Sequence, residues 1–177
     1  MADFNEKELW LQLLEKAWAK VNGSYSSTIA GLPTEAFSVL IEAPTFSYLN
    51  KKCSHEFWKI IDVDESKYII CTNSNGDVNE MAGLVIGHAY IIICAYELKG
   101  IRLLKLRNPW VSYECTEDYS DRSDKWILEL RDYVEFKNID DGLFRWQSKT
   151  FKSINFICLF VNTKIIIFLW IQKIPSR

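Results

Sequence analysis

Two segments near the N-terminus carry apolar residues at the spacing of an α-helix. Between residues 6 and 20, leucine and tryptophan recur three and four positions apart, and glutamate and lysine lie between them. This pattern predicts an amphipathic helix that packs one face on the core, and Asn22-Gly23 provides a helix stop. A shorter helix is predicted over residues 34–41. The stripe of the first helix consists of Leu9, Trp10, Leu13, Leu14, Ala17 and Trp18.

The middle of the chain has the residue types of β-strands. Residues 85–96 are rich in β-branched and aromatic side chains, and residues 101–106 alternate between apolar and polar. Lys99-Gly100 lies between them, so the two segments predict a hairpin. Residues 68–72 and 154–160 predict two further strands.

Residues 54–66 fit two different structures. Ser54 could cap a helix with Phe57, Trp58 and Ile61 on one face, whereas residues 58–63 also have the pattern of a strand. The segment 73–77 (Asn-Ser-Asn-Gly-Asp) is rich in turn-forming residues and predicts a loop.

The predicted hairpin brings His88 and Asn108 to the same end of an antiparallel strand pair. A thiol protease needs a histidine that takes the proton of a cysteine, and a third group that holds the imidazole in one tautomer. An asparagine carbonyl oxygen can do the latter without adding charge, and Trp110 could shield that hydrogen bond. From the residues alone a second interpretation stays open, because a lone strand histidine is often a core residue and Asn-Pro is common in turns.

The turn position also predicts a distance. With the turn at Lys99-Gly100, position 88 pairs near position 111, and Asn108 lies one diagonal step away. Such neighbours have Cβ atoms about 5–8 Å apart, so we expect His88 and Asn108 to meet, partly exposed, at one edge of the sheet with Trp110 against them.

Composition and charge exclude several classes of protein. The length of 177 residues with 49% hydrophobic content predicts one domain with a full core. A net charge of −2 provides no electrostatic footprint for nucleic acid. Five cysteines without metal-site spacing predict neither a disulfide framework nor a zinc site, and favour reduced thiols in the cytoplasm.

Several motifs closely resemble those of the calpain cysteine proteases. The family's His and Asn motifs are resembled by Gly-Leu-Val-Ile-Gly-His-Ala-Tyr (83–90) and Leu-Arg-Asn-Pro-Trp (106–110). Two earlier blocks, at 8–25 and 31–37, also resemble the family, and all the blocks occur in the family's order over residues 8–160. The resemblance implies an α+β fold, with N-terminal helices packed on an antiparallel sheet as in the second half of a papain-like protease. It also implies a calcium-dependent cysteine endopeptidase in which His88 is the general base, Asn108 orients it and Trp110 shields the pair.

The family's nucleophilic cysteine has no counterpart in this sequence. In calpains it lies upstream, in a Gln-Gly-x-x-Gly-Asp-Cys-Trp-like segment at a helix N-terminus. The resemblance therefore covers the second catalytic subdomain, and we expect the isolated chain to be inactive and to need a separate cysteine-bearing subdomain to cut protein substrates. The alternative is a non-catalytic calpain-like module for interaction or calcium binding. The cysteines that lack the nucleophile's context are Cys53, Cys71, Cys94, Cys115 and Cys158.

Calpains bind calcium in this subdomain through acids that follow the Asn motif and through a later Asp-Gly turn. Aligned on Arg-Asn-Pro-Trp, Glu114, Asp121 and Asp141 fall on those positions. Calcium takes six to eight oxygen ligands, and Leu143 stands where the best-known calcium-regulated members carry glutamate, so we expect a weakened site. The residues alone leave open that the acidic run is a solvated face.

The last segment, residues 161–177, matches nothing in the family. Its apolar run at 165–171 lies between Lys164 and Lys173, far short of the roughly 20 residues that span a bilayer. We therefore expect a calpain-like subdomain over residues 1–160 and an apolar extension over 161–177, without a membrane anchor.

Overall fold

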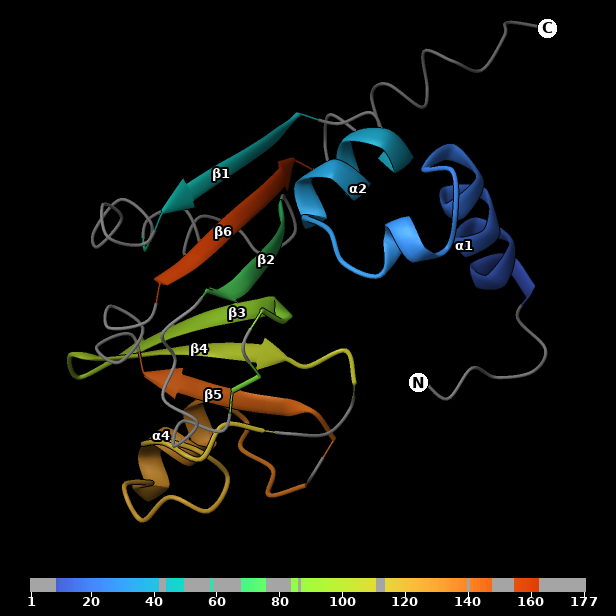
Figure 1. Cartoon of the computed structure of the whole chain (residues 1–177). Coiled ribbons are helices and arrows are strands. Elements are labelled where there is room, and N and C mark those ends of the chain that lie inside the picture. The colour runs from blue at the N-terminus through green and yellow to red at the C-terminus, as the bar shows by residue number, and fades with distance from the viewer. Residues whose placement is uncertain are drawn as a thin grey trace, which may run out of the picture.

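A six-stranded antiparallel sheet carries most of the described structure (Figure 1). The computed structural model describes residues 9–41, 44–49, 58, 68–75, 84–85, 87–110, 114–139, 141–147 and 155–162. The strands lie in the order β1-β6-β2-β3-β4-β5. Their bounds are Thr45–Leu49 (β1), Tyr68–Asn75 (β2), Ala89–Leu98 (β3), Ile101–Arg107 (β4), Leu143–Gln147 (β5) and Asn155–Asn162 (β6).

Helices lie at both ends of this sheet (Figure 1). Near the β1–β6 end, α1 (Leu9–Val21), a 3-10 turn η1 (Ser26–Thr28) and α2 (Pro33–Ile41) form a helical unit, and α2 packs against β1 and β6. At the other end, α4 (Leu128–Tyr133) lies beside β4 and β5. The fold is therefore α+β, as predicted.

The hairpin of β3 and β4 forms where it was predicted. Its two-residue turn places both Lys99 (φ 51°) and Gly100 (φ 78°) in the left-handed region, as a type I′ turn requires. The ladder contains a bulge between Ile92 and Cys94. Because a bulge adds one residue to one strand only, the register beyond it shifts by one and sets position 88 opposite position 110 instead of 111.

The core occupies both faces of the sheet, because β4 buries two consecutive residues, Leu103 and Leu104, on opposite sides. One face packs against α4 and its loops, through Leu103, Tyr119, Trp126, Leu130 and Val134. The other face forms the larger cluster, which consists of Trp58, Ile70, Leu84, Tyr90, Ile92, Leu104, Leu106, Cys115, Phe144 and Trp146.

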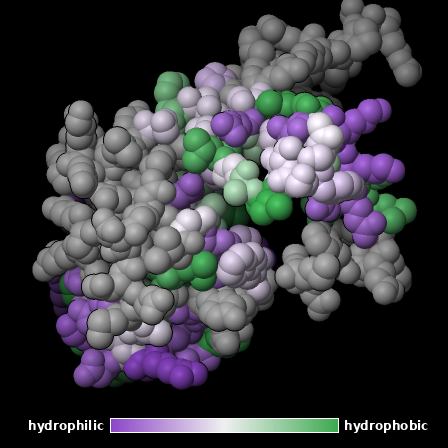
Figure 2. Space-filling model, in the orientation of Figure 1, coloured by the Kyte–Doolittle hydropathy of each residue, from purple (hydrophilic) through white to green (hydrophobic). Residues whose placement is uncertain are grey.

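The prediction that the α1 stripe packs in the core is wrong. Leu9, Trp10 and Leu13 are 63%, 59% and 65% exposed, and Ala19 is the buried residue of this helix. Periodicity locates an apolar face but does not show which surface packs against it. Among the described elements, α1 packs mainly on η1. Figure 2 shows hydrophobic side chains at the surface of the α1–α2 region, interspersed with hydrophilic ones.

Other expectations have mixed outcomes. The second helix and the strands β2, β3, β4 and β6 form, but β2 continues through Asn75 into the predicted loop, and β3 begins at Ala89. Of the ambiguous segment 54–66 the structure describes Trp58, which is helical and buried. Residues 163–177 lie outside the described residues. No described helix is both long and apolar enough to cross a membrane.

Candidate active site

His88 lies immediately before β3, at the end of a turn that depends on glycine. Gly87 has a φ of 68°, and an added Cβ there would meet nothing within 4 Å. The requirement is therefore for the left-handed backbone conformation and not for space. The turn leaves the His88 side chain half-buried, at the end of the β3–β4 hairpin that is opposite its tight turn.

Asn108 follows β4 and meets His88 as the hairpin predicted. The His88 Nε2 atom lies 2.8 Å from the Asn108 Oδ1 atom. The backbone N–H of Trp110 donates to the same oxygen at 3.0 Å. Because Oδ1 accepts from a backbone N–H, it is the oxygen of the amide, and the Nε2 atom of His88 must donate to it. Nε2 therefore carries a proton, and Nδ1 holds the lone pair when the ring is neutral.

The prediction that Asn108 is partly exposed is wrong. Its side chain is fully buried, and its backbone N–H donates to the Gly142 carbonyl at 2.8 Å. This bond continues the β4–β5 ladder one residue beyond the pair Arg107–Leu143. Asn108 is therefore held by the sheet itself, which fixes the position of its backbone.

Two aromatic rings enclose the imidazole of His88. The Trp110 ring lies against it at a centroid distance of 4.1 Å and is itself about half exposed. The ring of Tyr90, which is fully buried, contacts the imidazole edge-on at 4.9 Å. The His88–Asn108 hydrogen bond thus lies in a region of reduced dielectric, where such bonds are stronger than in water.

Tyr90 is a part of this arrangement that the sequence reasoning missed. Its hydroxyl accepts a hydrogen bond from the Val85 N–H at 2.9 Å, which ties the segment before the Gly87 turn to the core. Burial raises the pKa of Tyr90, and the bond from Val85 partly opposes that rise. The sequence could have indicated this contact. Residues two apart on a strand share a face, and Tyr90 is two residues after His88 in the predicted strand.

The described cysteines do not provide a reactive thiol. Cys71, Cys94 and Cys115 are buried and free of disulfides. Burial raises the pKa of Cys71 to about 11 and that of Cys115 to about 12, so both thiols are protonated at neutral pH, whereas a nucleophile must be a thiolate. Cys53 and the side chain of Cys158 lie outside the described residues.

The three acids that were predicted as calcium ligands all accept from backbone N–H groups of one short segment, residues 139 and 141–143, that leads into β5. Glu114 Oε1 accepts from the N–H groups of Asp141 and Gly142 at 3.1 and 2.8 Å. Asp121 Oδ2 accepts from the Ile139 N–H at 3.2 Å, and Asp141 Oδ1 accepts from the Leu143 N–H at 2.9 Å. The carboxylates therefore bind backbone N–H groups of this loop.

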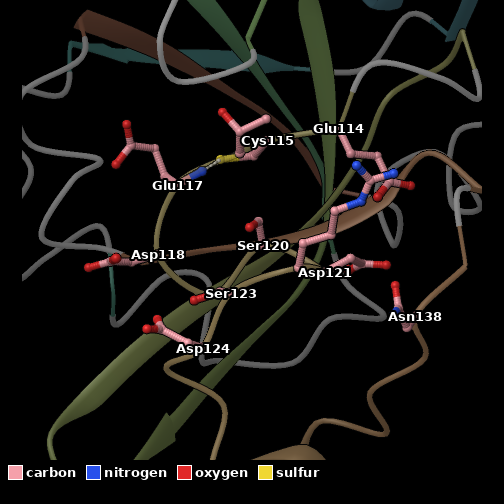
Figure 3. A pocket seen from close by; sticks show the side chains of 11 residues that line it. Glu114, Cys115, Glu117, Asp118, Ser120, Asp121, Ser123, Asp124 and Asn138 are labelled. Carbon is pink, nitrogen blue, oxygen red and sulfur yellow. Dashed lines mark hydrogen bonds between the residues drawn. The ribbon is translucent and has the colours of Figure 1, made fainter.

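Glu114 and Asp121 also line a cavity of about 860 Å³ (Figure 3). Its other lining residues include Glu117, Asp118 and Asp124, but not Asp141. Within the part of the chain that the structure describes, no group of three or more His, Cys, Asp or Glu side chains lies close enough to hold a metal ion. These acids are thus arranged as acceptors for the loop and not as a preformed carboxylate cluster.

Comparison with known proteins identifies relatives of this chain. The Calpain-1 catalytic subunit of Rattus norvegicus is 33% identical over 130 residues, which cover 67% of this chain and 18% of the relative. Calpain-9 of Mus musculus is 30% identical over 165 residues, with coverage of 85% and 24%. Calpain-7 of Sus scrofa is 31% identical over 160 residues, with coverage of 79% and 19%. The chain spans about a fifth of the length of these relatives.

The family model matches a larger share of the chain than each of these pairwise alignments. The model described as "Calpain family cysteine protease" matches residues 1–162, which include the strands, the helices and the His88–Asn108 pair. The chain therefore belongs to the calpain family of cysteine proteases.

Proposed function

We propose that this chain is the part of a calpain-type cysteine endopeptidase that carries the catalytic histidine and asparagine. The observation that carries the proposal is the 2.8 Å contact between His88 Nε2 and Asn108 Oδ1 beneath the Trp110 ring. Family membership supports it, because the pair lies within the matched residues.

In the proposed reaction His88 is the general base. Its Nδ1 atom takes the proton of a cysteine thiol, which yields a thiolate and an imidazolium. Asn108 Oδ1 accepts the Nε2–H bond in both protonation states, so the ring keeps its orientation while its charge changes. The thiolate attacks the peptide carbonyl carbon, and His88 then donates its proton to the leaving amine as the C–N bond breaks.

We propose that the nucleophilic thiol comes from a segment outside these 177 residues. The high pKa values of Cys71 and Cys115 support this, because a buried neutral thiol does not form the ion pair with an imidazole. The isolated chain is then inactive on protein substrates, and its partner is a cysteine-bearing subdomain. Free buried cysteines also fit a reducing compartment, the cytoplasm.

We further propose that the acidic loop binds calcium weakly. Glu114, Asp121 and Asp141 each carry a carboxylate beside residues 139 and 141–143, but the three do not form a preformed cluster, and Leu143 provides no carboxylate. We expect binding at roughly 10⁻⁴ to 10⁻³ M, the range of weak extracellular modules. Thermal unfolding should then shift only at millimolar calcium. A shift at micromolar calcium, or none at ten millimolar calcium, would contradict this expectation.

The second candidate function is a non-catalytic calpain-like module for interaction or calcium binding. It is favoured by the buried, protonated thiols of the described residues. Fusion of the cysteine-bearing segment of the Calpain-1 catalytic subunit to this chain separates the two functions. The enzyme proposal expects casein hydrolysis that His88→Ala abolishes and Asn108→Ala reduces, with mutation of the donated cysteine as the control. Soluble, correctly folded fusions without any turnover would favour the module.

A further inference from the structure

The backbone of Asn108 is linked to the side chain of Glu114 by a continuous series of hydrogen bonds through Gly142. Its N–H donates to the Gly142 carbonyl at 2.8 Å, and the Gly142 N–H donates to Glu114 Oε1 at the same distance. The N–H of Asp141 donates to that carboxylate oxygen as well, at 3.1 Å. Asn108 in turn accepts from His88, so the series begins at Glu114 and ends at the imidazole.

The geometry of the turn at Asp141-Gly142 explains how Glu114 can orient Asn108. Glu114 fixes two consecutive N–H groups, and Asp141 Oδ1 fixes the next one, that of Leu143. In a trans peptide the C=O and N–H groups point in opposite directions. Because the Leu143 N–H points to Asp141, the Gly142 carbonyl of the same peptide unit points away from it, toward Asn108.

Two further features make this turn dependent on its anchors. Gly142 is buried and has a φ of 78°, a left-handed conformation that only a few residue types adopt readily. Hydrogen bonds to a carboxylate are about twice as strong as those between neutral groups, and Glu114 is only partly exposed. Loss of this acceptor leaves two N–H groups beside a buried residue without their partner.

We propose that Glu114 is a positioning residue for the His88–Asn108 pair and acts without a metal ion. Its carboxylate oxygen holds the 141–142 turn, and the turn holds the Asn108 backbone, which sets the amide oxygen on the imidazole. The catalytic meaning of this link depends on the proposed function, but the link itself does not. The essential property is the position of the acceptor oxygen, and the negative charge strengthens the two hydrogen bonds without changing where they point.

The test uses the full chain in calcium-free buffer with a chelator. The readouts are the ¹⁵N chemical shifts of the His88 ring, which report its tautomer, and the hydrogen-exchange rate of the Asn108 amide. In Glu114→Ala we expect the tautomer preference to weaken and Asn108 exchange to accelerate about tenfold, which corresponds to about 1.4 kcal/mol. If Glu114 serves only as a calcium ligand, neither readout changes in calcium-free buffer, and the proposal is overturned.

Two variants separate acceptor position from charge and do not require the alanine variant to fold. Glu114→Gln keeps an oxygen at the same reach, so we expect Asn108 exchange within about threefold of wild type. Glu114→Asp keeps the charge but shortens the side chain by one methylene, so we expect faster exchange. The reverse order, with aspartate protective and glutamine disruptive, would overturn the proposal.

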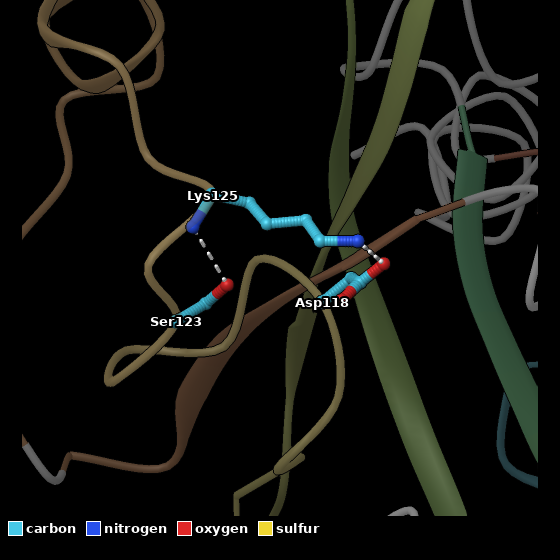
Figure 4. A network of polar contacts seen from close by, with 3 residues as sticks. All are labelled: Asp118, Ser123 and Lys125. Carbon is cyan, nitrogen blue, oxygen red and sulfur yellow. Dashed lines mark hydrogen bonds and ion pairs between the residues drawn. The ribbon is translucent and has the colours of Figure 1, made fainter.

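Asp118 provides a matched control in the same loop. It lines the same cavity, but its Oδ2 atom pairs with Lys125 Nζ at 2.6 Å, while the Lys125 N–H donates to Ser123 Oγ (Figure 4). Asp118→Asn should leave both readouts unchanged. An equal change in Asp118→Asn would mean general loosening of the loop and would overturn the role of Glu114. Because no readout requires proteolysis, an inactive fusion enzyme with these results would contradict the proposed function alone.

Discussion

The two ends of the molecule use their apolar residues differently. Around β4, consecutive leucines are buried on opposite faces, and the His88–Asn108 pair lies at one end of the β3–β4 hairpin. Along α1, a sequence pattern of equal regularity leaves Leu9, Trp10 and Leu13 more than half exposed. The difference shows that periodicity defines a face, whereas burial requires a second surface of matching shape.

The comparison can be tested most strongly by truncating one large residue at each end. Phe144 is fully buried and its ring contacts Tyr90 edge-on at 5.8 Å, so Phe144→Ala should lower the free energy of unfolding by about 3–5 kcal/mol. Leu13 is 65% exposed, and Leu13→Ala should change it by less than about 0.5 kcal/mol. Urea denaturation followed by tryptophan fluorescence measures both; comparable losses would show that the α1 face contributes to the core.

A second substitution examines the polar part of the sheet region. Asn108→Ala removes the acceptor shared by His88 Nε2 and the Trp110 N–H within a buried environment. We expect a loss of about 1–3 kcal/mol, the cost of removing a buried acceptor from two hydrogen bonds. His88→Ala should cost less, because His88 is only half-buried. The opposite order in urea denaturation would mean that the histidine ring, and not the amide, stabilises this end of the hairpin.

The smallest expected effect concerns pH. Burial raises the pKa of Cys115 from 9.0 to about 12 and that of Cys71 from 9.0 to about 11. A folded pKa above the unfolded value means that the unfolded chain releases these protons first. The stability contributed by the neutral thiols is thus fully present below about pH 9 and is lost as the pH rises toward 11 and 12. Melting temperatures at pH 7 to 10.5 should fall less steeply in Cys115→Ala; identical slopes would contradict a raised pKa.

The contact between His88 and Asn108 could be predicted because its sequence signal is local. The hairpin turn at Lys99-Gly100 sets which residues meet, and His88 and Asn108 lie on either side of it. The prediction of position 111 opposite 88 was off by one, because the bulge at Ile92–Cys94 has no clear mark in the sequence. The burial of Asn108 was missed because it depends on Gly142, more than thirty residues later.

Three elements, β1, α4 and β5, were not predicted from the sequence. β5 was missed because Arg145 occupies a buried position in it, where its Nη2 atom lies near the carbonyls of Val134 and Glu135. β1 and α4 are short, and their patterns do not differ from those of loops. No local pattern shows that β6 lies between β1 and β2, because strand order is decided by tertiary contacts.

The position of β6 has a consequence for how the protein is made. Val161 pairs with Thr45 and also with Ile69, so β6, the last of the described strands, joins β1 to the rest of the sheet. Contacts of such long sequence separation form slowly, and synthesis from the N-terminus delivers β6 after all its partners. Until residues 155–162 leave the ribosome, the edge of β2 is open to pairing with other chains. A stalled or nicked product that ends before residue 155 should therefore aggregate, so the pairing of β6 is the step that protects the nascent protein.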